Sequence, residues 1–365
     1  MLHRSSAGMD FRETELISTA MQLVRGQPEI RHICFHRFPG EWLYPDRIEQ
    51  QVDHAELEAQ LKRALSSGEG RRMRGSRAHL GIPTQLTVLR RISGLPDVPR
   101  ARMKEILEFE VAENIPLPFD EPIYDFVPLT SSASPEAPSL LQEAAEAAAA
   151  AEADQPGSEI ILFATSRRLS EQLARAVRSA GLKPISAEVK GLALRRLMHH
   201  LSPDWLREFE IVLDMGERSF DLHIYREGML VFSRNIAMDR WDYLTGDAAR
   251  LAAGSLRLAA LAATDYDIGR YAEETAREID SAVNFFRYSM NEREKPVSRL
   301  VIVGKYDETL PQRLAALTGY PVEMPDFTRM RKRRYHPDAL LSQAAVSIGL
   351  ALRGCLHENR SIKPI

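Results

Sequence analysis

The stretch EIVLDMGERSFDLHIYREGMLVFSRNIA, residues 210–237, decides the fold. It contains three runs rich in β-branched and aromatic residues, and the turns between them contain Gly216 and Gly228. Apolar runs separated by short glycine-containing turns are typical of consecutive antiparallel strands. The stretch therefore predicts a β-meander.

Helix and strand patterns alternate after this meander. Apolar residues recur at helical spacing in residues 273–290, an apolar strand-like run occupies residues 299–305, and residues 340–354 again have a helical pattern. Strands that lead into helices and return to the same sheet are typical of α/β domains. We expect residues 206–365 to form one such α/β lobe.

A different pattern precedes the meander. Residues 100–114 predict a helix, and the strand-like runs PIYDFVPL and EIILFATS lie on either side of an alanine-rich, low-complexity stretch at 130–158. Because both runs lie so close to this stretch, we expect them to be strands that pair with each other, and the stretch to be a surface insertion between them. The alternative is that the stretch is an interdomain linker. With the helical pattern at 167–182, residues 95–188 predict a small α+β unit.

Composition limits the partners and the environment. The 48 Lys and Arg residues and 51 Asp and Glu residues among 365 give a net charge of −3, which argues against a nucleic-acid-binding protein. We interpret the basic run RMRKRR, residues 329–334, as a solvated loop. Two cysteines and the absence of an apolar run of about 20 residues predict a cytoplasmic protein without disulfides or membrane spans.

DMG at Asp214–Gly216 is the clearest candidate binding motif. It puts a carboxylate at the end of an apolar strand and a glycine in the following turn. Backbone amides of such a turn can approach a phosphate while the carboxylate holds hydrated Mg²⁺, but the same two residues are also ordinary turn formers. The motif alone leaves both interpretations open.

Five segments, in their order along the chain, resemble the PilM family of type IV pilus assembly proteins, which are relatives of FtsA with the actin-like ATPase fold. The segments are LEFEVAENIPLPFDEPIYDF, RAVRSAGLKPISAEVKGLALRRL, VLDMGERSFDLHIYREGMLVFSRNI, REIDSAVNFFRYS followed by VIVGK, and AAVSIGLALR. The resemblance implies a two-lobed α/β fold. Its domains would be a first lobe at 1–94 and 189–205, an inserted SHS2-type α+β subdomain at 95–188, and a second lobe at 206–365.

The resemblance also implies a site for ATP and Mg²⁺ that is built from three loops. The residues of this chain that would contact the nucleotide are Asp10, Asp214, Gly216, Gly304, Lys305 and, near the ribose, Glu278. Asp214 would also be the metal ligand.

The chain departs from the family pattern in the first and third loops. Arg12 occupies a glycine position of the first phosphate loop, Ile17 lies near the usual lysine, and Gly304 stands where two glycines are usual. The Arg12 side chain would either crowd a phosphate or bind it through the guanidinium group. We expect weak ATP binding without efficient hydrolysis, more typical of a pseudo-ATPase scaffold than of an enzyme.

The function implied by the resemblance is that of a cytoplasmic adaptor recruited to the inner face of the inner membrane. It would bind the cytoplasmic N-terminal peptide of a PilN-type inner-membrane protein, and the dependence of this binding on nucleotide is left open. Pilus assembly ATPases would be further partners, and the protein would contact the membrane only through its partner. Two alternatives remain open: an active ATPase or kinase of the actin-like superfamily, and a cytoplasmic scaffold of the type II secretion L type.

Overall fold

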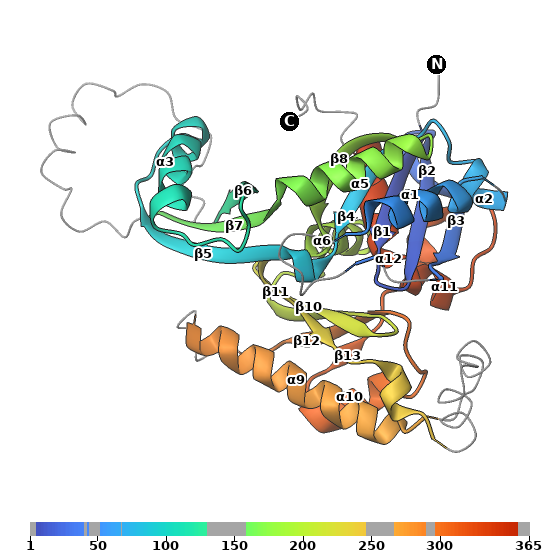
Figure 1. Cartoon of the computed structure of the whole chain (residues 1–365). Helices are drawn as coiled ribbons and strands as arrows, with labels where there is room; N and C mark the ends of the chain where they lie inside the picture. Colours follow the sequence, from blue (N-terminus) through green and yellow to red (C-terminus); the bar gives the residue numbers. More distant parts are fainter. Residues whose placement is uncertain are drawn as a thin grey trace, which may run out of the picture. The chain divides into compact units, whose positions relative to one another are not determined.

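The computed structural model describes residues 5–39, 42–43, 52–66, 68–129, 158–245, 266–289 and 296–356. It divides into two compact units, residues Met1–Leu86 with Arg168–Ile365, and residues Thr87–Arg167 (Figure 1). The low-complexity loop that we expect at 130–158 lies outside the described residues except for Ser158.

The first lobe of the larger unit is built on a six-stranded sheet in the order β14-β3-β2-β1-β4-β8. Its strands are β1 (Ser6–Phe11), β2 (Glu15–Val24), β3 (Gln27–Arg37), β4 (Arg77–Ile82), β8 (Lys183–Val189) and β14 (Arg331–Lys332). Strands β1, β2 and β3 are antiparallel neighbours, whereas β4 runs parallel to both β1 and β8.

The basic run that we interpret as a solvated loop is partly a strand. Arg331 and Lys332 form β14, which pairs with β3.

Helices cover both faces of this sheet (Figure 1). The helices of the lobe are α1 (His54–Ala64), α2 (Gly68–Arg71), α5 (Arg167–Ser179), α6 (Lys190–Leu201), α11 (Asp338–Gln343) and α12 (Ala345–Leu356), with a 3₁₀ turn at Thr84–Leu86. Because side chains alternate along a strand, Met9 of β1 packs in the core with α1 and α5. Gly8 faces α12, where a Cβ would lie 1.9 Å from the Ser347 carbonyl oxygen. The helix that we expect at 340–354 is divided at Ala344.

The second lobe of the same unit is built on a five-stranded sheet in the order β11-β10-β9-β12-β13. Its elements are β9 (Phe209–Met215), β10 (Ser219–Arg226), β11 (Met229–Ala237), β12 (Arg299–Gly304), β13 (Val322–Glu323), α9 (Ile268–Ser289) and α10 (Leu310–Thr318), with 3₁₀ turns at Arg240–Tyr243 and Phe327–Arg329. The predicted meander is confirmed as β9, β10 and β11, and the predicted strand at 299–305 as β12. Helix α9 has 22 residues, but no described helix is long and apolar enough to span a membrane.

In its described residues, the smaller unit has a three-stranded antiparallel sheet with helix α3 packed on it. Its elements are β5 (Thr87–Leu95), β6 (Pro122–Pro128), β7 (Ser158–Ser166) and α3 (Arg100–Glu113). The predicted pairing of the two runs beside the low-complexity stretch is confirmed, because β6 and β7 are hydrogen-bonded neighbours. Met103 and Leu107 of α3 pack against Phe126, Ile160 and Leu162 of the sheet.

The boundaries of this unit differ from the expected 95–188. Strand β5, which precedes residue 95, belongs to the small unit because it pairs with β7. Helix α5 and strand β8 belong to the larger unit because β8 pairs with β4 of the six-stranded sheet. The partner of β8 lies about a hundred residues earlier in the chain, so local sequence patterns could not assign it.

Candidate functional site

The turn between β1 and β2 places Asp10 and Arg12 at the edge of the first lobe. Asp10 lies near the end of β1 and is fully buried. The backbone N–H of Arg12 donates to the Glu15 carbonyl oxygen at 2.9 Å, and the Trp42 indole donates to the Arg12 carbonyl oxygen at 3.0 Å. Because Trp42 is itself buried, these bonds fix the backbone of Arg12 and the direction of its side chain.

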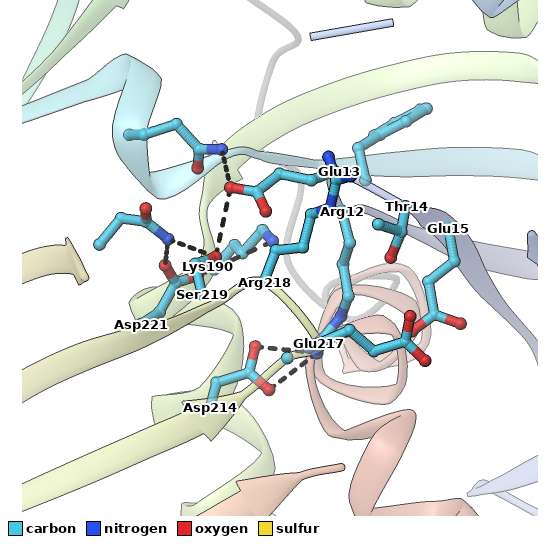
Figure 2. Close-up of a pocket in the computed structure, with 14 residues that line it drawn as sticks. Arg12, Glu13, Thr14, Glu15, Lys190, Asp214, Glu217, Arg218, Ser219 and Asp221 are labelled. Carbon is cyan, nitrogen blue, oxygen red and sulfur yellow. Dashed lines mark hydrogen bonds and ion pairs between the residues drawn. The ribbon is translucent and has the colours of Figure 1, made fainter. Parts of the chain in front are cut away.

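The Arg12 guanidinium group joins Asp10 and Asp214, two carboxylates that are 204 residues apart in the chain, and Figure 2 shows its bonds to Asp214. Its Nε donates to Asp10 Oδ2 at 2.7 Å, and its Nη2 donates to the two oxygens of Asp214 at 2.7 and 2.9 Å. Its Nη1 also donates to the Met215 carbonyl oxygen at 3.3 Å. The Arg12 side chain is 10% exposed, so these charge-assisted bonds form largely away from water.

Lys190 supplies a second cation to the same group of carboxylates. Its Nζ lies 2.9 Å from Asp10 Oδ1 and 3.8 Å from Asp221 Oδ2, and its side chain is 5% exposed. Lys190 is the first residue of α6, where the helix dipole disfavours a positive charge. The two aspartates compensate for this unfavourable position.

Asp214 and Asp221 face each other directly across the antiparallel pair β9–β10. Like charges at directly opposite positions destabilise a sheet, so two aspartates there require nearby cations. Arg12 supplies the cation on the Asp214 side and Lys190 the one on the Asp221 side. We call Asp10, Asp214, Asp221, Arg12 and Lys190 the aspartate cluster.

The aspartate cluster contains three acids and two bases, and burial and charge together shift the pKa of Asp10, Asp214 and Lys190. Burial works to raise the pKa of Asp10, but Arg12 and Lys190 together hold that pKa below its ordinary value. Burial raises the pKa of Asp214 to about 6, and Arg12 only partly opposes this rise. Burial favours neutral Lys190, yet Asp10 and Asp221 hold its pKa above the ordinary value. Both cations therefore stay charged at neutral pH, and the surplus negative charge falls on Asp214.

A small polar cavity opens beside the cluster, with a volume of about 30 Å³. Its lining residues are Phe11, Arg12, Glu13, Thr14, Glu15, Gln85, Lys190, Asp214, Gly216, Glu217, Arg218, Ser219, Asp221 and Asn235 (Figure 2). In the same measure a single water needs roughly 10–15 Å³, so the cavity has room for ordered water beside the cluster.

The structure brings together five of the six residues that the resemblance assigns to a nucleotide site. Asp10 and Asp214 are joined through Arg12, and Gly216 forms the β9–β10 turn, in which its N–H donates to the Ser219 carbonyl oxygen at 3.0 Å. A Cβ on Gly304 would lie 2.9 Å from Asp214 Oδ1, and Lys305 Nζ lies 2.6 Å from Glu217 Oε1. The sixth residue, Glu278, is on α9 and is not among the residues that line the cavity.

The residues present do not fit a Mg²⁺ ion held by Asp214. Both Asp214 oxygens accept hydrogen bonds from Arg12, so a metal would have to displace a buried guanidinium group. In the part of the chain that the structure describes, no three acidic, histidine or cysteine side chains are grouped as a metal site. A phosphate would also meet Glu13, Glu15 and Glu217, all of which line the cavity.

Sequence reasoning missed Lys190 and Asp221. Asp221 could have been found by counting outward from the Gly216 turn, because Met215 pairs with Phe220 and the next pair is Asp214 with Asp221. Lys190 gave no such signal, because its role depends on where α6 begins relative to β10. For Arg12, the expectation of a side chain in the first loop is correct, but its binding partners are carboxylates rather than a phosphate.

The two α/β lobes define the class of protein by fold: they have the actin-like fold, and here a group of buried acids and bases joins strands of the two lobes. PilM has the same fold as this chain. The solved structure of a PilM–PilN type IV pilus biogenesis complex matches 96% of this chain and 98% of its own, at 22% identity and a TM-score of 0.71. The ethanolamine utilization protein EutJ from Carboxydothermus hydrogenoformans matches over 96% of this chain and 90% of its own, at 11% identity and a TM-score of 0.50.

The resemblance to PilM and the expected actin-like α/β fold are confirmed by these structural matches. The sequence matches no family model and none of the curated proteins. At 22% identity, what the chain shares with PilM is the fold.

Proposed function

We propose that this chain is a cytoplasmic, non-catalytic adaptor of type IV pilus assembly. In this role it binds the cytoplasmic N-terminal segment of a PilN-type inner-membrane protein and is recruited to the inner face of the inner membrane through that partner. The observation that carries the proposal is the match to PilM from a PilM–PilN complex over 96% of the chain, a range that includes the smaller unit Thr87–Arg167 as well as the two lobes.

The aspartate cluster supports a binding role over an enzymatic one. Phosphoryl transfer requires a metal and a positioned nucleophile at the phosphates. Here the Asp214 carboxylate is bound by Arg12, and Glu13, Glu15 and Glu217 line the neighbouring cavity. An adaptor needs neither the metal nor the phosphate, so the same residues are compatible with a protein whose task is to hold a partner.

A peptide-binding measurement tests the proposal. A fluorescent synthetic peptide with the cytoplasmic N-terminal sequence of a PilN-type protein is titrated with the full chain, and anisotropy is recorded with and without Mg·ATP. We expect saturable binding that is the same in both conditions and absent for a scrambled peptide. Absence of binding by the native peptide would contradict the adaptor proposal.

A second measurement separates the adaptor from the ATPase alternative. We expect phosphate release from Mg·ATP to equal that of a sample without protein. Release above this level that disappears in Asp214→Ala would move the chain to the ATPase class. Pilus assembly ATPases, proposed as further partners, can be tested by co-purification with the full chain and with a sample lacking it.

A further inference from the structure

We propose that Arg12 and Lys190 are a built-in substitute for a bound metal ion, and that they help to hold the two lobes of the larger unit together by pairing with carboxylates of both. Asp10 belongs to β1 of the first lobe, whereas Asp214 and Asp221 belong to β9 and β10 of the second. Each cation contacts a carboxylate from both lobes: Arg12 contacts Asp10 and Asp214, and Lys190 contacts Asp10 and Asp221.

The charge balance supports this substitution. The resemblance assigns Asp10 and Asp214 to the phosphate loops of a site for Mg²⁺ and ATP. In this chain, Arg12 and Lys190 together place two positive charges among those carboxylates, the same charge that one Mg²⁺ ion would bring. Unlike a dissociable ion, these two charges are covalently part of the chain and are present at all times.

The surrounding structure holds the Arg12 side chain in place. The Arg12 backbone is hydrogen-bonded to Glu15 and Trp42, and its guanidinium group donates to four oxygen atoms of three residues on two strands. A guanidinium group holds its N–H donors in a fixed planar arrangement, whereas a lysine ammonium group acts as a point charge. Exchange of Arg12 for a Mg²⁺ ion would therefore require breaking a buried, ordered set of bonds.

Loss of either member of the Arg12–Asp214 pair leaves the other charge buried without its partner, which is strongly unfavourable. The proposal therefore predicts that removal of Arg12 creates an acidic site with a newly acquired affinity for divalent cations. Arg12→Ala frees both oxygens of Asp214 and one of Asp10, while Lys190 remains. Wild type has these oxygens bonded and should show no such affinity.

The test is thermal unfolding of the full chain in MgCl₂ alone, compared with NaCl of equal ionic strength. For wild type we expect no change in the melting temperature. Arg12→Ala should melt at a lower temperature than wild type in NaCl and recover by at least about 3 °C in millimolar MgCl₂, because a ligand that binds the folded state alone stabilises it. The matched control is Arg37→Ala, which removes an arginine whose side chain is 42% exposed and whose partner Glu217 keeps its contact with Lys305. This control should show no response to Mg²⁺.

A double-mutant cycle and a direct binding experiment complete the test. If Arg12 acts through Asp214, the double variant Arg12→Ala with Asp214→Asn should lose less stability than the sum of the single losses. Additive losses, or an Arg12→Ala variant that ignores Mg²⁺, would overturn the proposal. If that variant does not fold, calorimetry of wild type with Mg·ATP decides: saturable heat overturns the proposal, and its absence supports it. Peptide binding is measured separately, so this result and the adaptor result can fail independently.

Discussion

Two of the buried groups of ion pairs in the described part of the larger unit differ in charge balance, and the difference indicates what each contributes. In the first, which we call the Glu188 cluster, Glu188 receives a bidentate pair of bonds from Arg196 at 2.6 and 2.9 Å and a third from Arg353 at 2.5 Å. These residues come from β8, α6 and α12, all in the first lobe. The aspartate cluster instead has more acids than bases and joins strands of both lobes.

Opposite pKa shifts accompany this difference in charge balance. Burial favours neutral Glu188, but Arg196 and Arg353 hold its pKa below the ordinary value, so the charged form stabilises the fold. Burial raises the pKa of Asp214 to about 6, so its charged form is less stable in the folded protein than in the unfolded chain. The Glu188 cluster therefore stabilises the folded protein, whereas the charged form of Asp214 in the aspartate cluster lowers the free energy of unfolding.

Glu188→Gln should give the largest loss of stability. The substitution leaves Arg196 and Arg353 without their carboxylate, and breaking one side of a buried ion pair costs about 3–5 kcal/mol. The free energy of unfolding is measured by urea denaturation. Glu323→Gln is the matched control, because Glu323 pairs with Arg299 at 3.2 Å but its own side chain is 47% exposed. We expect this control to change the free energy of unfolding by less than about 1 kcal/mol. Equal losses in the two variants would remove the contrast drawn between buried and exposed pairs.

The next largest effect should come from two buried histidines, one beside each cluster. His79 bonds Ser186 Oγ through Nδ1 at 2.8 Å, and His223 bonds Ser233 Oγ in the same way at 2.8 Å. Burial lowers the pKa of each to about 4. Between pH 6.5 and 4 the unfolded chain therefore binds more protons than the folded one, and stability falls as pH falls, by at most about 3 kcal/mol for each histidine.

The measurement is urea denaturation at pH 7, 5.5 and 4.5 for wild type, His79→Gln and His223→Gln. Each variant lacks one of these titrations, so the difference in unfolding free energy between wild type and variant should shift in favour of the variant as pH falls. A difference that does not depend on pH would show that the histidine is not a source of acid sensitivity. Because Asp214 shifts in the opposite sense, the wild-type slope alone does not test this prediction.

Elements that pair with neighbours along the chain could be predicted from the sequence. Contacts between segments that are distant in the chain could not. The meander at 210–237 and the pairing of β6 with β7 follow from apolar runs separated by turns or an insertion. The place of β8 beside β4 and the position of Lys190 beside Asp10 depend on contacts across more than a hundred residues. Neither of these two contacts produces a periodic pattern in the sequence around β8 or Lys190.

The same reasoning applies at the candidate site. The resemblance assigned Asp10, Asp214, Gly216, Gly304 and Lys305 to one site, and the structure places them near one another without testing that they bind a nucleotide. The motifs could not show that Arg12 reaches Asp214, because side-chain length and direction decide that contact. Glu278 was assigned by analogy alone, and it does not line the cavity.

The smallest effect should come from the basic run, which provides an exposed counterpart to both buried clusters. Arg331 donates to Gln27 Oε1 at 2.9 Å, and Arg334 lies 3.5 Å from Glu69 with a side chain that is 60% exposed. Exposed charge pairs contribute about 0–1 kcal/mol and are screened by salt, so Arg331→Ser with Arg334→Ser should change the unfolding free energy by less than about 1 kcal/mol. Urea denaturation at low and physiological salt measures this change, and the anisotropy titration should show the same affinity for the PilN-type peptide. A larger loss of stability would mean that these two side chains stabilise the pairing of β14 with the six-stranded sheet. A loss of affinity for the peptide would place the basic run in the partner-binding surface.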